Sequence, residues 1–152
     1  MVMFLTSAGG ELDLGALIPS LESVLGALDI LTRALVLAGP LSLLGFGLFF
    51  FLKPPGEANY TAGYRFRYGM ARVGSWQFMQ KLAGIVYSIT GLLLTVIMAF
   101  LCARFKYLAP MDMVMTAGKM ILWEVGALIV ATLGINVTVM ILFDHKGKRR
   151  KK

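Results

Sequence analysis

The stretch that decides the fold is LAGIVYSITGLLLTVIMAFLCA, residues 82–103, which contains no charged side chain. A membrane helix needs about 20 apolar residues, because each residue adds about 1.5 Å and the hydrocarbon core is about 30 Å thick. Two further stretches, 30–52 and 120–143, are similarly long, and each holds a single charged side chain. None alternates as an outer-membrane β-strand does. The sequence therefore predicts an all-α membrane protein with three transmembrane helices.

The composition of the whole chain supports this class. The 152 residues are 58% hydrophobic and 15% charged, with a mean hydropathy of +0.77. Counted with glycine and without tyrosine, about two thirds are apolar, against about 45–50% in soluble domains. The single cysteine and single histidine exclude an intrachain disulfide and a Cys/His zinc site within one chain. We expect one small domain without metal or cofactor.

Basic residues are distributed unevenly along the chain. Eleven lie in the loop 53–81 and the tail 144–152, whereas the loop 104–119 has three and residues 1–29 have none. Basic residues close to membrane spans stay on the cytoplasmic side. We therefore expect the N-terminus outside and the C-terminus in the cytoplasm. The net charge of +7 then faces anionic lipid headgroups, and it does not indicate a nucleic-acid partner.

The N-terminal segment 1–29 is expected to be separate from the membrane domain 30–152. It lacks the basic start of a signal peptide, so we do not expect cleavage. Its apolar residues recur at helical spacing, which predicts an interfacial amphipathic helix outside the membrane. The alternative is that this segment extends the first span. The recurring residues are Leu14, Leu17, Ile18, Leu21, Val24, Leu25 and Leu28.

The loop 53–81 is an unusual linker. Pro54 and Pro55 end the first helix, because neither has a backbone N–H and each restricts the residue before it. Between residues 64 and 68, aromatic and arginine residues alternate. An extended chain would place the rings on one face and the guanidinium groups on the other, which suits the lipid headgroup layer.

This loop resembles the signature of the SdpI/YhfL family, small bacterial multi-pass membrane proteins that include bacteriocin immunity factors. The family pattern is two prolines, Asn, Gly-Tyr-Arg, then Trp and Gln. The chain departs from the pattern at Phe66, where Thr is usual, and at Gly69, where Ser is frequent. The matching residues are Pro54, Pro55, Asn59, Gly63, Tyr64, Arg65, Trp76 and Gln80, and the tail residues Phe143, Asp144, Gly147, Lys148 and Arg149 resemble a common ending.

The resemblance implies a protein of the bacterial cytoplasmic membrane that gives immunity to a toxic peptide, in some members with signal relay to a repressor. Arg65 is the first candidate for a binding residue, because its fork of donors suits a phosphate or carboxylate. Alternatively, it sets topology and closes the loop on backbone carbonyl groups. Asn59 is interpreted as a cap, and Trp76 as an interfacial anchor more than a binding contact.

Polar side chains inside the predicted spans are a second group of candidates. Arg33 and Glu124 each lie about one turn inside the outer end of a span, and we predict that they pair. The alternative is that Arg33 reaches the surface and Glu124 lies near water. Asn136 predicts a hydrogen bond between helices, and the spacing of Gly84 and Ser88 predicts close helix packing.

Two functions follow from these features. The first is a protective membrane protein that binds a membrane-active peptide or lipid, with the loop as its recognition or signalling surface. The second is an accessory subunit of a larger transporter or membrane enzyme. An enzyme is the weakest hypothesis, because no nucleophile with a base, carboxylate pair or phosphate-binding glycine loop is present in the sequence.

Overall fold

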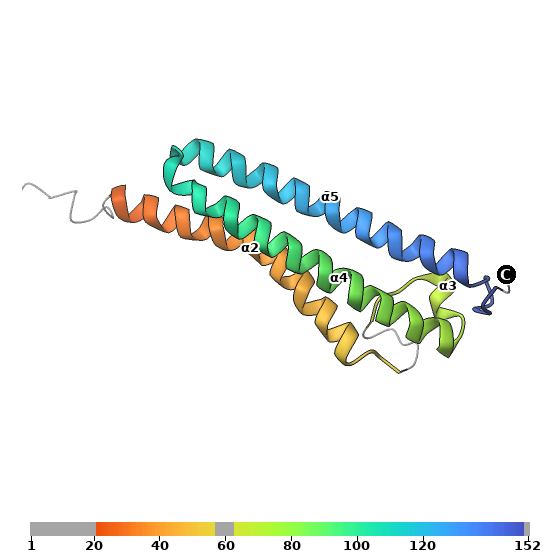
Figure 1. The fold of residues 1–152 in the computed structure, drawn as a ribbon. Helices are drawn as coiled ribbons and strands as arrows, with labels where there is room; N and C mark the ends of the chain where they lie inside the picture. The colour runs from red at the N-terminus through yellow and green to blue at the C-terminus, as the bar shows by residue number, and fades with distance from the viewer. Residues whose placement is uncertain (1–20, 57–62, 151–152) are drawn as a thin grey trace, which may run out of the picture.

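The computed structural model of the chain describes residues 21–56 and 63–150. Within these ranges the protein is all-α, with one isolated β-bridge, between Phe143 and Arg149. Three helices are long and apolar enough to cross a membrane, which confirms the predicted fold class. The elements, shown in Figure 1, are α2 (Leu21–Leu52), α3 (Arg67–Met70), α4 (Val73–Cys102), the 3₁₀ helix η1 (Ala103–Tyr107) and α5 (Pro110–Leu142).

The three long helices extend beyond the predicted spans 30–52, 82–103 and 120–143. Because α2 is unbroken from Leu21, residues 21–29 extend the first span and form no separate interfacial helix. The residues before 21 lie outside the described ranges. Helix α5 begins at Pro110, a position at which the missing N–H of proline costs little. The apolar runs therefore predicted the most apolar part of each helix and missed the turns that precede it.

Charged side chains lie at two levels along the bundle. Arg33 on α2 and Lys53, the residue after that helix, are about 20 residues apart, or roughly 30 Å along a helix. Lys81 on α4 and Arg104 in η1 are about 35 Å apart by the same rise per residue, and modest helix tilt accommodates the difference. On α5, Glu124 lies between these levels, opposite Gly39. We call the end with the α2–α4 connection and the tail the connector end, and the other the η1 end.

Helices α2 and α4 approach until their backbones touch. A Cβ added at Gly84 would lie 2.6 Å from the backbone nitrogen of Phe51, and one at Gly47 would overlap the backbone of Ser88. Gly91 faces α2 in the same way. Gly84 and Ser88 thus form the predicted small-residue contact, and their partner is α2 of the same chain. Such contacts hold membrane helices together, because lipid supplies no hydrophobic force between them.

Helix α5 packs against this pair at two separate places. Between them, residues 121–134 of α5 are mostly exposed, with Glu124 as the buried exception. The cluster near the η1 end contains Val36, Met98, Cys102, Phe105, Met113, Ala117 and Met120. The cluster near the connector end contains Trp76, Met79, Ala83, Tyr87, Ile135, Val139 and Phe143.

The glycine contact predicts opposite effects of alanine at two sites. Gly84→Ala should lower the free energy of unfolding by about 1–3 kcal/mol, because its methyl group meets the backbone of Phe51. Gly126→Ala on α5 should leave it unchanged or raise it by up to about 1 kcal/mol, since no atom lies within 4 Å of that Cβ and alanine favours helix. Thermal unfolding in detergent measures both. Equal effects of the two changes would contradict the close packing.

Candidate functional site

We call the connection between α2 and α4, residues 53–72, the connector; the structure describes it at 53–56 and 63–72. The side chain of Gln80 holds the second part of the connector against α4. Its Oε1 accepts the backbone N–H of Tyr64 at 2.8 Å, and its Nε2 donates to the carbonyl of the same residue at 2.7 Å. Gln80 is fully buried and lies in the early turns of α4, not in the loop where the sequence placed it. The side-chain amide of Gln80 therefore bonds both backbone groups of Tyr64, as a neighbouring β-strand would. Its role is structural.

Trp76 and Gly63 complete this clamp. The indole N–H of Trp76 donates to the carbonyl of Pro55 at 2.8 Å, and its side chain is fully buried. Trp76 is therefore a buried residue of α4 that holds the connector, in place of the predicted interfacial anchor. Gly63 has φ +116°, and a Cβ there would lie 2.9 Å from the Trp76 ring and 3.1 Å from Gln80 Oε1. Glycine is needed both for the backbone conformation and for the space.

Tyr64 connects the clamp to α5. Its hydroxyl donates to Asn136 Oδ1 at 2.7 Å, and its ring lies edge-on to Tyr87 at 5.8 Å. Burial, with a smaller contribution from Tyr87, raises the pKa of Tyr64 to about 12. The Tyr87 hydroxyl in turn shares a hydrogen bond with Thr132 Oγ1 at 3.0 Å. Asn136 thus accepts a hydrogen bond from Tyr64 in the connector, in place of the predicted hydrogen bond between helices.

The alternating strip is confirmed in part. Arg65 and Arg67 are exposed, whereas the rings of Phe66 and Tyr68 are half-buried, stack at 5.6 Å and pack on the connector-end core. The extended backbone stops at Phe66, because α3 begins at the next residue. The rings therefore anchor the strip, and the guanidinium groups lie on the outer surface of the connector.

The two signature prolines differ in what they contact. The carbonyl of Pro55 accepts the Trp76 N–H, whereas Pro54, two residues after the end of α2, is half-buried. Asn59, the predicted cap, lies outside the described residues. Sequence reasoning missed Tyr87 and Thr132, since nothing local in the sequence links them to residue 64.

The C-terminal tail folds back on the start of α4. Asp144 Oδ1 accepts the backbone N–H of Lys148 at 2.8 Å and that of Lys146 at 2.9 Å. Gly147 has φ +68°, and a Cβ there would lie 2.8 Å from Ser75 Oγ. The family-like ending is therefore a tight turn at the connector end, where Figure 1 shows the end of α5 beside α3. The two backbone donors, that of Lys148 first, lower the pKa of Asp144.

The predicted pairing of Arg33 with Glu124 is wrong. Arg33 Nε bonds Asp29 at 2.8 Å, one helical turn earlier, and its Nη1 donates to the carbonyl of Cys102. Its guanidinium also lies over the Phe105 ring at 5.6 Å. Arg33 thus caps the carbonyl end of α4, where helix carbonyl groups lack partners. Its donors are used at the η1 end, away from Glu124.

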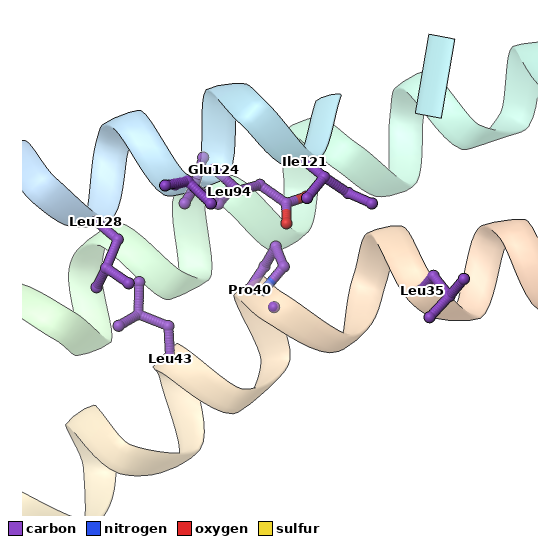
Figure 2. Close-up of a pocket in the computed structure, with 9 residues that line it drawn as sticks. Leu35, Pro40, Leu43, Leu94, Ile121, Glu124 and Leu128 are labelled. Atoms are coloured by element: carbon purple, nitrogen blue, oxygen red, sulfur yellow. The ribbon is translucent and has the colours of Figure 1, made fainter. Parts of the chain in front are cut away.

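Glu124 lies deeper, in a groove open to one side of the bundle. A Cβ at Gly39 would lie 2.7 Å from its Oε2, so Glu124 faces α2 about six residues, or roughly 9 Å, beyond Arg33. Because α5 begins at Pro110, Glu124 is about four turns from the helix start and not one. Figure 2 shows its carboxyl group directed at Pro40. The groove has a volume of about 350 Å³ and is otherwise apolar, with walls that include Leu43, Leu94, Ile121, Val125 and Leu128.

Comparison with known proteins does not assign this chain. No family model, no curated protein and no solved structure matches it.

The Gln80 clamp predicts a specific change in protease sensitivity. Gln80→Ala removes two hydrogen bonds, each contributing about 1 kcal/mol, so trypsin should cleave at Arg65 and Arg67 roughly thirtyfold faster. Gln77→Ala is the matched control, because that exposed side chain makes one long contact of 3.5 Å. Equal cleavage rates in the two variants would show that Gln80 does not hold the connector.

The tail turn predicts an acid transition. A carboxylate with a lowered pKa stabilises the turn above its unfolded pKa, and that contribution is lost as pH falls through the folded value. The amide signals of Lys146 and Lys148 should therefore shift with a midpoint below about 3.9, the usual value for aspartate. Nuclear magnetic resonance of labelled protein in detergent measures this, and Asp144→Asn should abolish the transition. A midpoint above 4 would argue against the turn.

Proposed function

We propose that this chain is an SdpI/YhfL-type protein of the bacterial cytoplasmic membrane, which protects the membrane from a membrane-active peptide by binding and without catalysis. The observation that carries the proposal is the use of the signature residues. Gln80 bonds the backbone of Tyr64, Trp76 bonds the carbonyl of Pro55, and Gly63 packs closely on both side chains. Arg65 and Arg67 are therefore presented on a braced surface.

This braced surface suits acidic ligands. A guanidinium group binds carboxylate or phosphate through a fixed fork of donors. The rings of Phe66 and Tyr68, beside Arg65 and Arg67, are held by stacking and by core contacts. Binding therefore costs little conformational entropy in this segment. Exposed Arg72 and the basic tail lie at the same end of the bundle and add positive charge.

The ligand chemistry follows from this location. Under the predicted orientation, the connector end faces the cytoplasmic headgroup layer. A peptide that has inserted into the membrane reaches this layer, and its acidic groups would meet Arg65 and Arg67. The same surface is the one large basic face available for signal relay to a cytoplasmic partner.

The second candidate function is an accessory subunit, and one observation favours it. On α5, no atom lies within 4 Å of a Cβ built at Gly118, Gly126 or Gly134, and Trp123 is 77% exposed. Small residues on an open helix face are typical of packing between membrane helices. A partner helix could therefore cover this face of α5.

The protective function predicts the result of a complementation experiment. Cells that lack the gene, challenged with a panel of membrane-active peptides, should regain survival with wild-type protein and lose most of it with Arg65→Gln/Arg67→Gln. Arg65→Lys/Arg67→Lys keeps the charge that sets topology but lacks the fork, so it should restore only part. The survival ratio at a fixed peptide dose is the measurement.

Controls separate the two functions. Arg104→Gln/Lys106→Gln removes two charges at the η1 end and should protect fully, provided that membrane levels match. Full protection by the Arg65→Gln/Arg67→Gln variant would remove the connector as the recognition surface. If deletion changes survival with no peptide, and a larger membrane complex copurifies, the accessory function replaces the protective one.

A further inference from the structure

The carboxyl group of Glu124 has a hydrogen-bonding requirement that the described residues do not meet. The side chain is 8% exposed, and its Oε1 is buried without a hydrogen-bond partner among those residues. A carboxyl group at this depth is costly unless it is paired or hydrogen-bonded. The other polar groups in or beside the spans that sequence analysis selected, Arg33 and Asn136, both have partners within the chain. Glu124 therefore needs a partner from outside.

The opposite wall of the groove lies close to this carboxyl. Gly39 makes room for the carboxyl itself, because a Cβ there would lie 2.7 Å from Glu124 Oε2. Pro40 follows Gly39 inside α2 and has no backbone N–H. The helix hydrogen bond that residue 40 would donate to the carbonyl of Val36 is therefore absent. The groove thus combines a carboxyl group and a weakened stretch of helix with apolar walls, as Figure 2 shows around Pro40, Leu43 and Leu94.

The size and chemistry of the groove restrict its occupant. Its volume of about 350 Å³ falls in the range of small-molecule sites. A calcium or magnesium ion prefers six or more oxygen ligands, whereas the side chains lining this groove supply one carboxyl group. A group that donates N–H bonds and carries positive charge would satisfy Glu124, and an apolar body would fill the leucine-lined remainder.

We propose that this groove binds a small lipophilic amine in its protonated form, with Glu124 as the counter-ion. The ammonium group donates hydrogen bonds to the Glu124 carboxylate, and the apolar body lies between α2 and α5. The open side of the groove faces lipid, so the amine enters laterally from the membrane. The inference does not rest on the protective function, because the groove is separate from the connector surface.

The test uses monodansylcadaverine, a fluorescent probe with an apolar body and one primary amine. Full-length protein in nanodiscs should give saturable, blue-shifted fluorescence above that of empty nanodiscs. The N-acetylated probe has the same dansyl group without the charge, and it should bind at least about tenfold more weakly. Glu124→Gln should weaken binding of the amine by a similar factor and leave the acetylated probe unaffected.

Further variants make the result decisive even if Glu124→Gln folds poorly. Gly39→Leu should abolish binding, because its side chain would collide with Glu124 Oε2 and displace the carboxyl, whereas Asp112→Asn, an acid on the same helix as Glu124 but outside the groove, should bind as wild type. Binding of both probes with equal affinity, or no binding above empty nanodiscs, would overturn the proposal. Cross-linking of Glu124→Cys between two copies without probe binding would instead make the groove a contact between chains. Failure of the peptide-survival experiment would leave these binding results unaffected.

Discussion

The contact on which the structure depends is the backbone approach of α2 and α4 at Gly47, Gly84 and Gly91. In lipid, such an approach gains dispersion energy that larger side chains would prevent. Its consequence concerns α5, which has no comparable backbone contact with the pair and packs on side chains near its two ends. The middle of α5 therefore stands away from α2, and the groove beside Glu124 is a result of where the glycines lie.

A second constraint comes from the connection between α2 and α4. A chain that leaves one membrane helix and enters the next must satisfy its backbone groups without the regular bonds of a helix. Trp76 and Gln80 supply those bonds from the first turns of α4, and Tyr64 reaches across to α5. The same few side chains thus hold the connector to the two following helices. This explains why signature residues that suggest binding are mainly buried, while the arginines between them are exposed.

The sequence was sufficient for the three spans, because an uninterrupted apolar run admits few structures in a membrane. The sequence did not predict how far Glu124 lies from the end of its helix. Glu124 was placed near a surface because the third span was expected to begin at residue 120. The earlier helix start at Pro110 was hidden by the charged residues Asp112 and Lys119, which interrupt the apolar run. The spacing of Asp29 and Arg33 did carry a local signal for pairing, since residues four apart meet on a helix. The bond from Tyr64 to Asn136 joins residues 72 positions apart, and no local pattern indicates it.

Most polar side chains discussed above have a hydrogen-bond partner or a packing role within the fold. Arg33 caps α4, Gln80 holds the connector and Asn136 accepts the Tyr64 hydroxyl, so each is accounted for by structure. Two buried side-chain atoms in the described chain have no partner: Ser88 Oγ and Glu124 Oε1. Ser88 lies at the glycine contact, where a small side chain is required for packing. Glu124 has no such explanation, since a neutral residue would seat α5 beside Gly39 equally well. A carboxyl group that the fold does not need, in a groove that admits a small molecule, is best explained by binding.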